Sequence, residues 1–435
     1  MIRGIYLTKI RLWMFLLVLL LTVLVGSASA ELTDKEKLGK NIFFDKISDP
    51  DSMSCADCHA PQVGFTGPIA GINLKGSVYR GAVPQRFGNR KPPSAAYATL
   101  SPNLYTEPGD EPGEVLFIGG NFWDGRATGE VLGNPAADQA MGPFLNPVEQ
   151  NNFDKKAVLE QIAASKYVWL WELVWGEPIS YGDTDEINES YNRTALAIAA
   201  YESSSEVNQF SSKYDANLTR GDELTEEEAW GLELFNAPNN NDGIKQVGEG
   251  GNCAACHPSN PENGEPPLFT DFTFDNLGIP RNPDNPFYDM DTVFVDGEAI
   301  NPEGMDWVDP GLGGFLATRP EWSTYAADNM GKHKVPTLRN VAQQPGKVFP
   351  KAYGHNGYFK SLESIVHFYN TRDLLDTCPD PFTTEKDALK MNCWPLPEVT
   401  ENVNTEELGN LSLTSEEEAA IVAFLKTLSD GYYVP

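Results

Sequence analysis

The chain has 435 residues, 41% of them hydrophobic, which suffices for two or three domains with buried cores. Its 62 acidic residues outnumber the 32 basic ones and give a formal net charge of −30. Such a surface repels nucleic acid and anionic lipid, which argues against both as partners, and it attracts a basic protein. Acidity that only keeps the protein soluble explains most of these charges equally well.

The first 30 residues have the layout of a secretory signal peptide. Basic residues at Arg3, Lys9 and Arg11 precede an apolar run over residues 13–25, and a segment of small residues ends at Ala30. The apolar run is short for a membrane span. We therefore expect cleavage after Ala30, export to the periplasm and no stable membrane span in the mature chain. An uncleaved anchor is the alternative.

Three copies of one pattern predict the starts of helices. A Thr followed three residues later by a Glu forms a capping box, in which both side chains pair with free backbone N–H groups. The copies are Thr33/Glu36, Thr225/Glu228 and Thr414/Glu417. Apolar residues follow each copy at helical spacing, so we expect a helix after each, the last extending to Leu428.

The first two of these helices lead into matching segments, which indicates an internal duplication. A further helix is predicted over residues 186–214, with a linker over residues 215–224. Long runs rich in Gly, Pro, Asn and Asp, such as residues 67–105 and 236–250, carry few strand signals. The sequence therefore predicts a mainly α-helical fold with long irregular loops and little β structure.

Four of the six cysteines lie in two copies of C-x-x-C-H, the attachment site of a c-type haem. The copies are Cys55, Cys58 and His59, and Cys253, Cys256 and His257. The thiols bond to the haem vinyl groups, and the adjacent histidine binds the iron. A zinc ribbon would lack the trailing histidine, and a thioredoxin motif would need a βαβ setting. We therefore expect two covalently attached haem c groups.

The remaining two cysteines are predicted to form a structural disulfide. Cys378 and Cys393 flank a polar loop, and disulfides persist in exported proteins. No catalytic role is assigned to either residue.

An amphipathic helix is predicted behind Ser361, whose side chain suits an N-cap. Leu362, Ile365, Val366 and Tyr369 follow at the i, i+3, i+4, i+7 spacing of one buried face. His367 is rotated by about 200° from Tyr369 and points away from that face. This rotation argues against His367 as a haem ligand.

Beyond the haem motifs, the chain resembles the bacterial di-haem cytochrome c peroxidase family, including its MauG-type members that oxidise protein side chains. The resemblance rests on FWDGRA (122–127), QAMGPFLNPVE (139–149), VPTLRNVA (335–342) and GHNGYFKSLESIVHFYN (354–370). It covers nearly the whole mature chain. It implies two cytochrome-c-like domains, which we place at residues 31–215, with the haem that reacts with peroxide, and 216–435, with the electron-transfer haem.

The resemblance implies roles for four residues near the first haem. Trp123 matches a tryptophan that lies between the two haems. Gln139, Pro143 and Glu149 fall at the spacing of the MauG-type distal pocket. Glu149 would move the peroxide proton, with its pKa raised by burial. Gln139 would orient peroxide, and Pro143 would shape the wall. A surface carboxylate at Glu149 and an ordinary buried aromatic at Trp123 are the alternatives.

For the second haem, the resemblance implies that Tyr369 stands where peroxidases carry a methionine ligand and MauG-type members a tyrosine. A phenolate would lower the potential of that haem. A plain core aromatic is the alternative. His355 would lie near the first haem and its propionates, or only close a turn. His333 matches no family ligand, and either a polar loop position or a haem-edge position fits it.

Calcium is left open by the resemblance. The family binds a calcium ion between its haems, but Tyr97, Pro350 and Ala352 replace the residues expected around it. No histidine lies between His59 and His257, so the first haem should keep an open coordination position.

The resulting expectation is a periplasmic di-haem peroxidase that reduces hydrogen peroxide with electrons relayed through the second haem. A MauG-type oxidase of tryptophan or tyrosine side chains in a partner protein is the second hypothesis. A non-enzymatic electron-transfer cytochrome is the third. The expected partner is an electron-donor protein, either a small c-type cytochrome or a cupredoxin, or else an oxidisable protein substrate.

Overall fold

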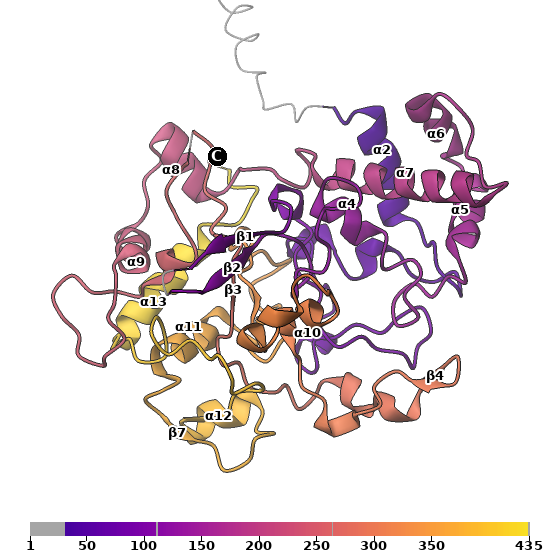
Figure 1. Ribbon diagram of the computed structural model, residues 1–435. Helices are drawn as coiled ribbons and strands as arrows, with labels where there is room; N and C mark the ends of the chain where they lie inside the picture. Colours follow the sequence, from indigo (N-terminus) through magenta and orange to yellow (C-terminus); the bar gives the residue numbers. More distant parts are fainter. Residues whose placement is uncertain (1–30, 110–111, 263, 434–435) are drawn as a thin grey trace, which may run out of the picture. The chain divides into compact units, whose positions relative to one another are not determined.

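The computed structural model describes residues 31–109, 112–262 and 264–433 (Figure 1). The predicted signal peptide, residues 1–30, lies outside the described residues. The chain from Asp34 onward forms one compact unit. Within the described ranges, no helix has both the length and the apolar character needed to cross a membrane.

Helices predominate, as the sequence predicted. In chain order they are α2 (Asp34–Phe44), α3 (Ala70–Asn73), α4 (Pro135–Ala140), α5 (Lys155–Ala163), α6 (Val168–Trp175), α7 (Thr184–Glu202), α8 (Lys213–Arg220), α9 (Glu226–Asn236), α10 (Gly311–Ala317), α11 (Leu362–Thr371), α12 (Glu385–Met391) and α13 (Ser415–Lys426). Long loops with short 3-10 turns connect them. The predicted mainly α fold with long irregular connections is confirmed.

The β structure of the described residues consists of two-stranded pairs. β1 (Tyr105–Pro108) pairs with β2 (Val115–Ile118), β3 (Phe274–Asp275) with β6 (His333–Lys334), and β4 (Phe294–Val295) with β5 (Glu298–Ala299), all antiparallel. β7 (Asp376–Thr377) and β8 (Cys393–Trp394) run parallel. The β3–β6 pair is the one that bears on function, because β6 carries His333 and Lys334.

Two helix pairs repeat the same close crossing. α2 packs on α7, and α9 packs on α13. A β-carbon at Gly39 would lie 1.8 Å from the carbonyl oxygen of Ala197, and one at Gly231 would lie 1.9 Å from that of Ala420. Both glycines stand six residues after their capping-box threonine. The duplication read from the sequence is therefore also present in the packing.

Two of the three predicted capping boxes are confirmed in the structure, and for the third the predicted helix start is confirmed. Thr225 and Thr414 each accept a hydrogen bond from the backbone N–H of the glutamate three residues on, and each glutamate accepts one in return. α2 begins at Asp34, directly after Thr33. Ser361 caps α11 by accepting from the Ser364 N–H, as predicted.

The helix predicted over residues 186–214 is wrong in its second half. α7 ends at Glu202, and α8 starts only at Lys213. The helix tightens there, because the Ser204 N–H donates to the Tyr201 carbonyl three residues back at 2.9 Å, and serine favours caps and turns over helix interiors. Ser212 and Asp215 then form a new capping box. α8 therefore occupies part of the predicted linker.

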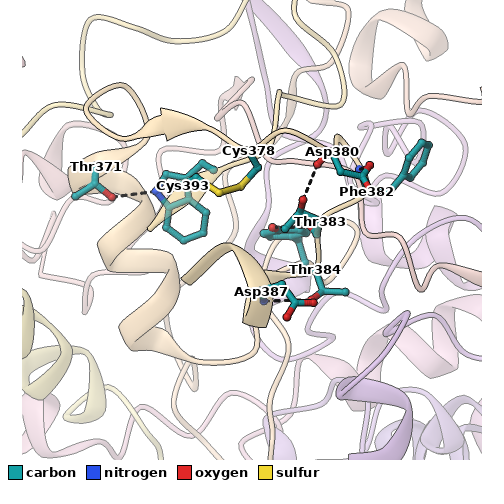
Figure 2. The surroundings of a disulfide bond; sticks show 10 residues. Thr371, Cys378, Asp380, Phe382, Thr383, Thr384, Asp387 and Cys393 are labelled. Carbon is teal, nitrogen blue, oxygen red and sulfur yellow. Dashed lines mark hydrogen bonds between the residues drawn. A yellow bond between two sulfur atoms is a disulfide. The ribbon is translucent and has the colours of Figure 1, made fainter. Parts of the chain in front are cut away.

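The disulfide prediction is confirmed. Cys378 and Cys393 are bonded, and both are buried (Figure 2). Cys378 directly follows β7 and Cys393 begins β8, and the neighbouring Trp394 indole donates to the Thr371 hydroxyl, at the end of α11, at 3.0 Å. The bridge thus anchors the polar loop beside the helix that carries Tyr369.

A buried ion pair ties α8 to the segment 335–342. Two nitrogens of Arg339 donate to the two carboxylate oxygens of Asp215 at 3.0 and 2.9 Å. Burial alone would raise the pKa of Asp215, but the Arg339 hydrogen bonds overcome this effect, so the pKa is lowered. Tyr214, next to Asp215, packs in the core formed by α9 and α13. The division at residue 215/216 stays a prediction.

Replacing Arg339 by methionine should lower the free energy of unfolding by about 3–5 kcal/mol, because Asp215 would be left buried without its partner. Urea unfolding followed by circular dichroism measures this change. The matched control is Arg220→Met, which breaks the exposed pair with Asp222 and should cost at most about 1 kcal/mol. Equal losses in both variants would contradict the structural role of the pair.

Candidate functional site

Two cavities in the described part of the chain each contain one C-x-x-C-H motif. Cys55, Cys58 and His59 line the first. Cys253, Cys256 and His257 line the second. In each motif a short 3-10 turn begins at the first cysteine, and the histidine N–H donates to that cysteine's carbonyl at 2.9 Å. The turn places both thiols and the histidine on the same cavity.

The two motif histidines are held in the same way. His59 Nδ1 donates to the Phe65 carbonyl at 3.2 Å, and His257 Nδ1 donates to the Phe269 carbonyl at 2.7 Å. Because a carbonyl only accepts, Nδ1 carries the proton and Nε2 keeps its lone pair. Burial lowers the pKa of each histidine to about 4, so each ring is neutral. This is the state that binds a metal.

The carbonyls that orient these histidines come from strained residues. Phe65 has φ 56° and Phe269 has φ 55°, a left-handed conformation that a bulky side chain rarely adopts. Such a conformation costs on the order of 1–3 kcal/mol and persists where the surroundings impose it. A Phe-Thr pair occurs at both places, Phe65-Thr66 and Phe269-Thr270. This repeated pair is a sequence signal that the motif analysis missed.

The arrangement fits a covalently attached haem in each cavity. The four motif cysteines are free of disulfides, their thiols line the cavities, and each histidine presents an unprotonated Nε2. The second cavity is the more apolar of the two, with leucine, isoleucine and valine side chains from α11 and α13 in its wall. These are the donor set and the apolar lining that a c-type haem requires.

The residues predicted for the distal pocket lie together in the first cavity. Gln139, Pro143 and Glu149 line it with His59. Gln139 lies on α4, which Asn134 caps by accepting from the Ala136 N–H. The fold therefore brings these three side chains to the cavity that contains the first C-x-x-C-H motif.

Glu149 is held by a neighbouring amide. Asn146 Nδ2 donates to its Oε2 at 2.7 Å. Burial raises the pKa of Glu149, while the charge of Arg126 and the Asn146 hydrogen bond oppose that rise in part. A carboxyl group with a raised pKa can accept and return a proton closer to neutral pH than an exposed one.

Trp123 lies between the two cavities and lines both. Its indole Nε1 donates to the Lys91 carbonyl at 2.8 Å, and its own carbonyl accepts from the Lys334 N–H at 2.9 Å. The next residue, Asp124, pairs with Arg90 and Arg126. The backbone therefore fixes the tryptophan from both sides at the junction.

Tyr369 lines the second cavity together with His257. Burial raises the pKa of its phenol, and within the described residues its hydroxyl has no hydrogen-bond partner. His367 pairs with Glu418 at 3.0 Å and is not among the residues lining either cavity. The prediction that His367 points away from the face of Tyr369 is confirmed.

His355 was expected near the first haem, but the structure places it at the second cavity. It lines the second cavity and is not among the residues of the first. Its ring stacks on that of His333 with centroids 3.6 Å apart, and Glu398 lies 3.3 Å from its Nε2. The β3–β6 pairing brings His333 to this cavity, so it is not a polar loop residue.

The three residues at the positions expected around a calcium ion have other contacts in the structure. The Tyr97 hydroxyl donates to Asp430 at 2.7 Å, and the Pro350 carbonyl accepts from Asn73 Nδ2 at 3.1 Å. Ala352 lines the second cavity. A calcium ion between the haems stays an open expectation.

Sequence reasoning missed one carboxylate of the first cavity. Glu202 is buried at the end of α7, lines that cavity, and has no hydrogen-bond partner among the described residues. Burial raises its pKa to about 8. Its place at the end of a long helix gave no sign of a cavity residue.

Comparison with known proteins agrees with this geometry. The profile of the family described as "Di-haem cytochrome c peroxidase" matches residues 33–223. The methylamine utilization protein MauG of Paracoccus denitrificans is 31% identical over 408 residues, which cover 92% of this chain and 89% of that protein. The chain belongs to the MauG-like di-haem cytochrome c peroxidase family.

Other members of the family match over a similar extent. The cytochrome-c peroxidase IdrP2 of Denitromonas iodatirespirans is 25% identical over 92% of this chain and 83% of that protein. The diheme peroxidase BthA of Burkholderia thailandensis superposes with a TM-score of 0.66 at 28% identity, over 91% of this chain and 86% of that one. A tyrosine-to-methionine variant of BthA gives 0.70 at 27% identity over the same shares. The chain is thus an oxidoreductase of a family that carries two haems.

Replacing Cys253 and Cys256 together by alanine should leave one covalent haem per chain, because only the first motif can still form thioether bonds. The pyridine haemochrome assay and the intact mass measure this number. The matched variant, Cys55→Ala with Cys58→Ala, should leave the other haem. Two covalent haems in either double variant would contradict the assignment of the motifs.

Proposed function

We propose that this chain is a periplasmic peroxidase that reduces hydrogen peroxide in the first cavity and receives its electrons through the second. The main support is the grouping of Glu149, Gln139 and His59 around one cavity. A peroxidase needs an iron ligand on one side and a proton-transfer group in the same cavity, and this grouping supplies both.

A haem held by His59 and the two neighbouring cysteines would supply the redox chemistry that breaks the peroxide O–O bond. Glu149 would take the proton from one peroxide oxygen and give it to the other, which would leave as water. Gln139 holds peroxide through its amide, and Pro143 limits the space around it. Two electrons and two further protons complete the reduction to a second water.

Trp123 is the proposed route for the electrons, because it is in the wall of both cavities. The strong negative charge of the chain favours a donor with a basic surface. A small c-type cytochrome or a cupredoxin has the right size and chemistry for this role. No nucleic acid and no membrane partner is proposed.

One observation favours a second function, the MauG-type oxidation of tryptophan or tyrosine side chains in a partner protein. Tyr369 lines the second cavity, where a phenolate bound to iron would favour the oxidised state of the haem. The 31% identity to a methylamine utilization protein points the same way. In this function the partner protein, not a small cytochrome, gives up the electrons.

Export to the periplasm is part of the proposal. The signal-like sequence of residues 1–30 and the disulfide between Cys378 and Cys393 both favour an oxidising compartment. Cleavage after Ala30 would give a mature chain that starts at Glu31.

Replacing Glu149 by glutamine should lower peroxide turnover by about 10²- to 10⁴-fold, the range for loss of a general acid–base group. In the wild type, turnover should fall as the pH drops through the raised pKa of Glu149, because a protonated carboxyl group cannot accept the first proton. This acid limb should be absent from the variant.

Stopped-flow turnover over a range of pH measures both effects. Glu160→Gln, which removes an exposed carboxylate on α5, is the matched control and should leave the profile unchanged. An E149Q variant with wild-type turnover would contradict the proposed proton transfer.

Replacing Tyr369 by methionine should raise the reduction potential of the second haem, because a thioether donates less electron density than a phenolate. With Tyr369 as the ligand, the wild-type diferric protein should respond to one equivalent of hydrogen peroxide with a joint loss of both resting haem signals. The variant should respond only after its second haem is reduced.

Optical and EPR spectra without added reductant measure this difference. If the wild type also responds to peroxide only after its second haem is reduced, it is a peroxidase that receives electrons from a cytochrome. Tyr369 is then not a ligand of the second haem. Peroxide turnover that is absent from both proteins would contradict the proposed function altogether.

A further inference from the structure

A lysine stands at corresponding positions in the two halves of the duplicated chain. Lys91-Pro92-Pro93-Ser94 in the first half corresponds to Lys334-Val335-Pro336-Thr337 in the second. Ser94 donates to the Gly64 carbonyl at 2.8 Å, and Thr337 donates to that of Leu268 at 2.6 Å. These acceptors precede Phe65 and Phe269, the residues whose carbonyls hold the two motif histidines.

A second pair of hydrogen bonds repeats in register. The Thr66 hydroxyl donates to the carbonyl after Lys91 at 2.6 Å, and the Thr270 hydroxyl donates to the carbonyl after Lys334 at 2.7 Å. Each lysine is therefore tied to the loop that orients the histidine of its own half. Both lysines line both cavities, and both contact Trp123 through their backbones.

Their ammonium groups meet only neutral partners. Lys91 Nζ donates to the Thr66 hydroxyl and the Pro92 carbonyl, both at 3.0 Å. Lys334 Nζ donates to the Ser101 hydroxyl at 2.9 Å and the Asn121 amide oxygen at 3.4 Å. Among the described residues neither forms an ion pair, whereas several other lysines pair with carboxylates, including Lys213, Lys245 and Lys426.

A buried cation without a counterion is destabilising, and removing water from one costs several kcal/mol. Burial lowers the pKa of Lys91 to about 8 and that of Lys334 to about 7. Lys351 and Lys360 also meet only neutral partners. Lys91 and Lys334, however, stand at corresponding places and line both cavities, where an anion from outside the polypeptide would complete the site. The anion must reach the junction of two cavities that each fit a haem.

We propose that Lys91 and Lys334 bind the propionate carboxylates of the two haems at the junction beside Trp123. The inference rests on the proposed covalent haems, because it assigns the counterions of those groups. A haem carries its two carboxylates on the edge opposite the vinyl groups, so cysteines and lysines hold opposite edges of each ring. The lysine charges also raise the reduction potentials, because they stabilise the form with one more electron.

The test uses Lys91→Met and Lys334→Met in the full-length haem-loaded protein. Methionine keeps the apolar stem and removes the charge. Each variant should retain two covalent haems but show a lower midpoint potential for at least one of them. A tenfold change in the reduction equilibrium, or about 59 mV for a one-electron couple, is the expected size.

Spectroelectrochemical titration measures the potentials, and resonance Raman bands of the propionate bending modes report on the hydrogen bonds to the carboxylates. Lys91→Arg and Lys334→Arg retain the charge and should restore both readouts. Lys360→Met is the matched control, because Lys360 also donates to backbone carbonyls but lines neither cavity. It should leave both readouts unchanged.

If a methionine variant does not fold, Lys91→Gln or Lys334→Gln takes its place with the same expectation. Two haems with unchanged potentials and Raman bands in both uncharged variants would overturn this inference alone. Equal shifts in Lys360→Met would also overturn it, because the effect would then not be local. A wild type without two covalent haems would overturn the haem assignment as well.

Discussion

The close contact between two helix backbones at Gly39, repeated at Gly231, is the constraint on which the positions of both cavities depend. A side chain at either glycine would overlap the facing helix, so the two pairs, α2 with α7 and α9 with α13, cross in the same way. The first helix of each pair precedes a C-x-x-C-H turn in the chain and packs against it. The crossing therefore sets the position of one cavity wall, and the repeat sets the other in the same way.

The loops after the haem motifs use strain to position their histidines. Phe65 and Phe269 adopt left-handed conformations so that their carbonyls meet Nδ1 of His59 and His257. The threonine after each phenylalanine binds the loop that carries Lys91 or Lys334. The orientation of the histidine and the position of the lysine are thus parts of one hydrogen-bonded unit, used twice.

Most features that depend on local sequence could be predicted, and those that depend on distant contacts could not. Capping boxes, the C-x-x-C-H turns and the stripe of α11 are set by residues a few positions apart, so the sequence alone reveals them. The break after Glu202 is the exception: serines follow it in the sequence, but an apolar pattern that continues beyond them favours a longer helix. The rings of His355 and His333 stack because the β3–β6 pairing and the loop after it bring them together. No local sequence pattern predicts this contact. For the same reason Glu202 and the two lysines went unnoticed.

The hydrogen bond from the Trp123 indole to the Lys91 carbonyl has a consequence for how charge crosses the junction. An amide carbonyl is too weak a base to take a proton at neutral pH, so an indole that gives up an electron here keeps its N–H. The oxidised indole would therefore keep its positive charge, and an electron could refill it without any proton transfer. In the proposed function, electron transfer at Trp123 would thereby be kept apart from proton transfer at Glu149.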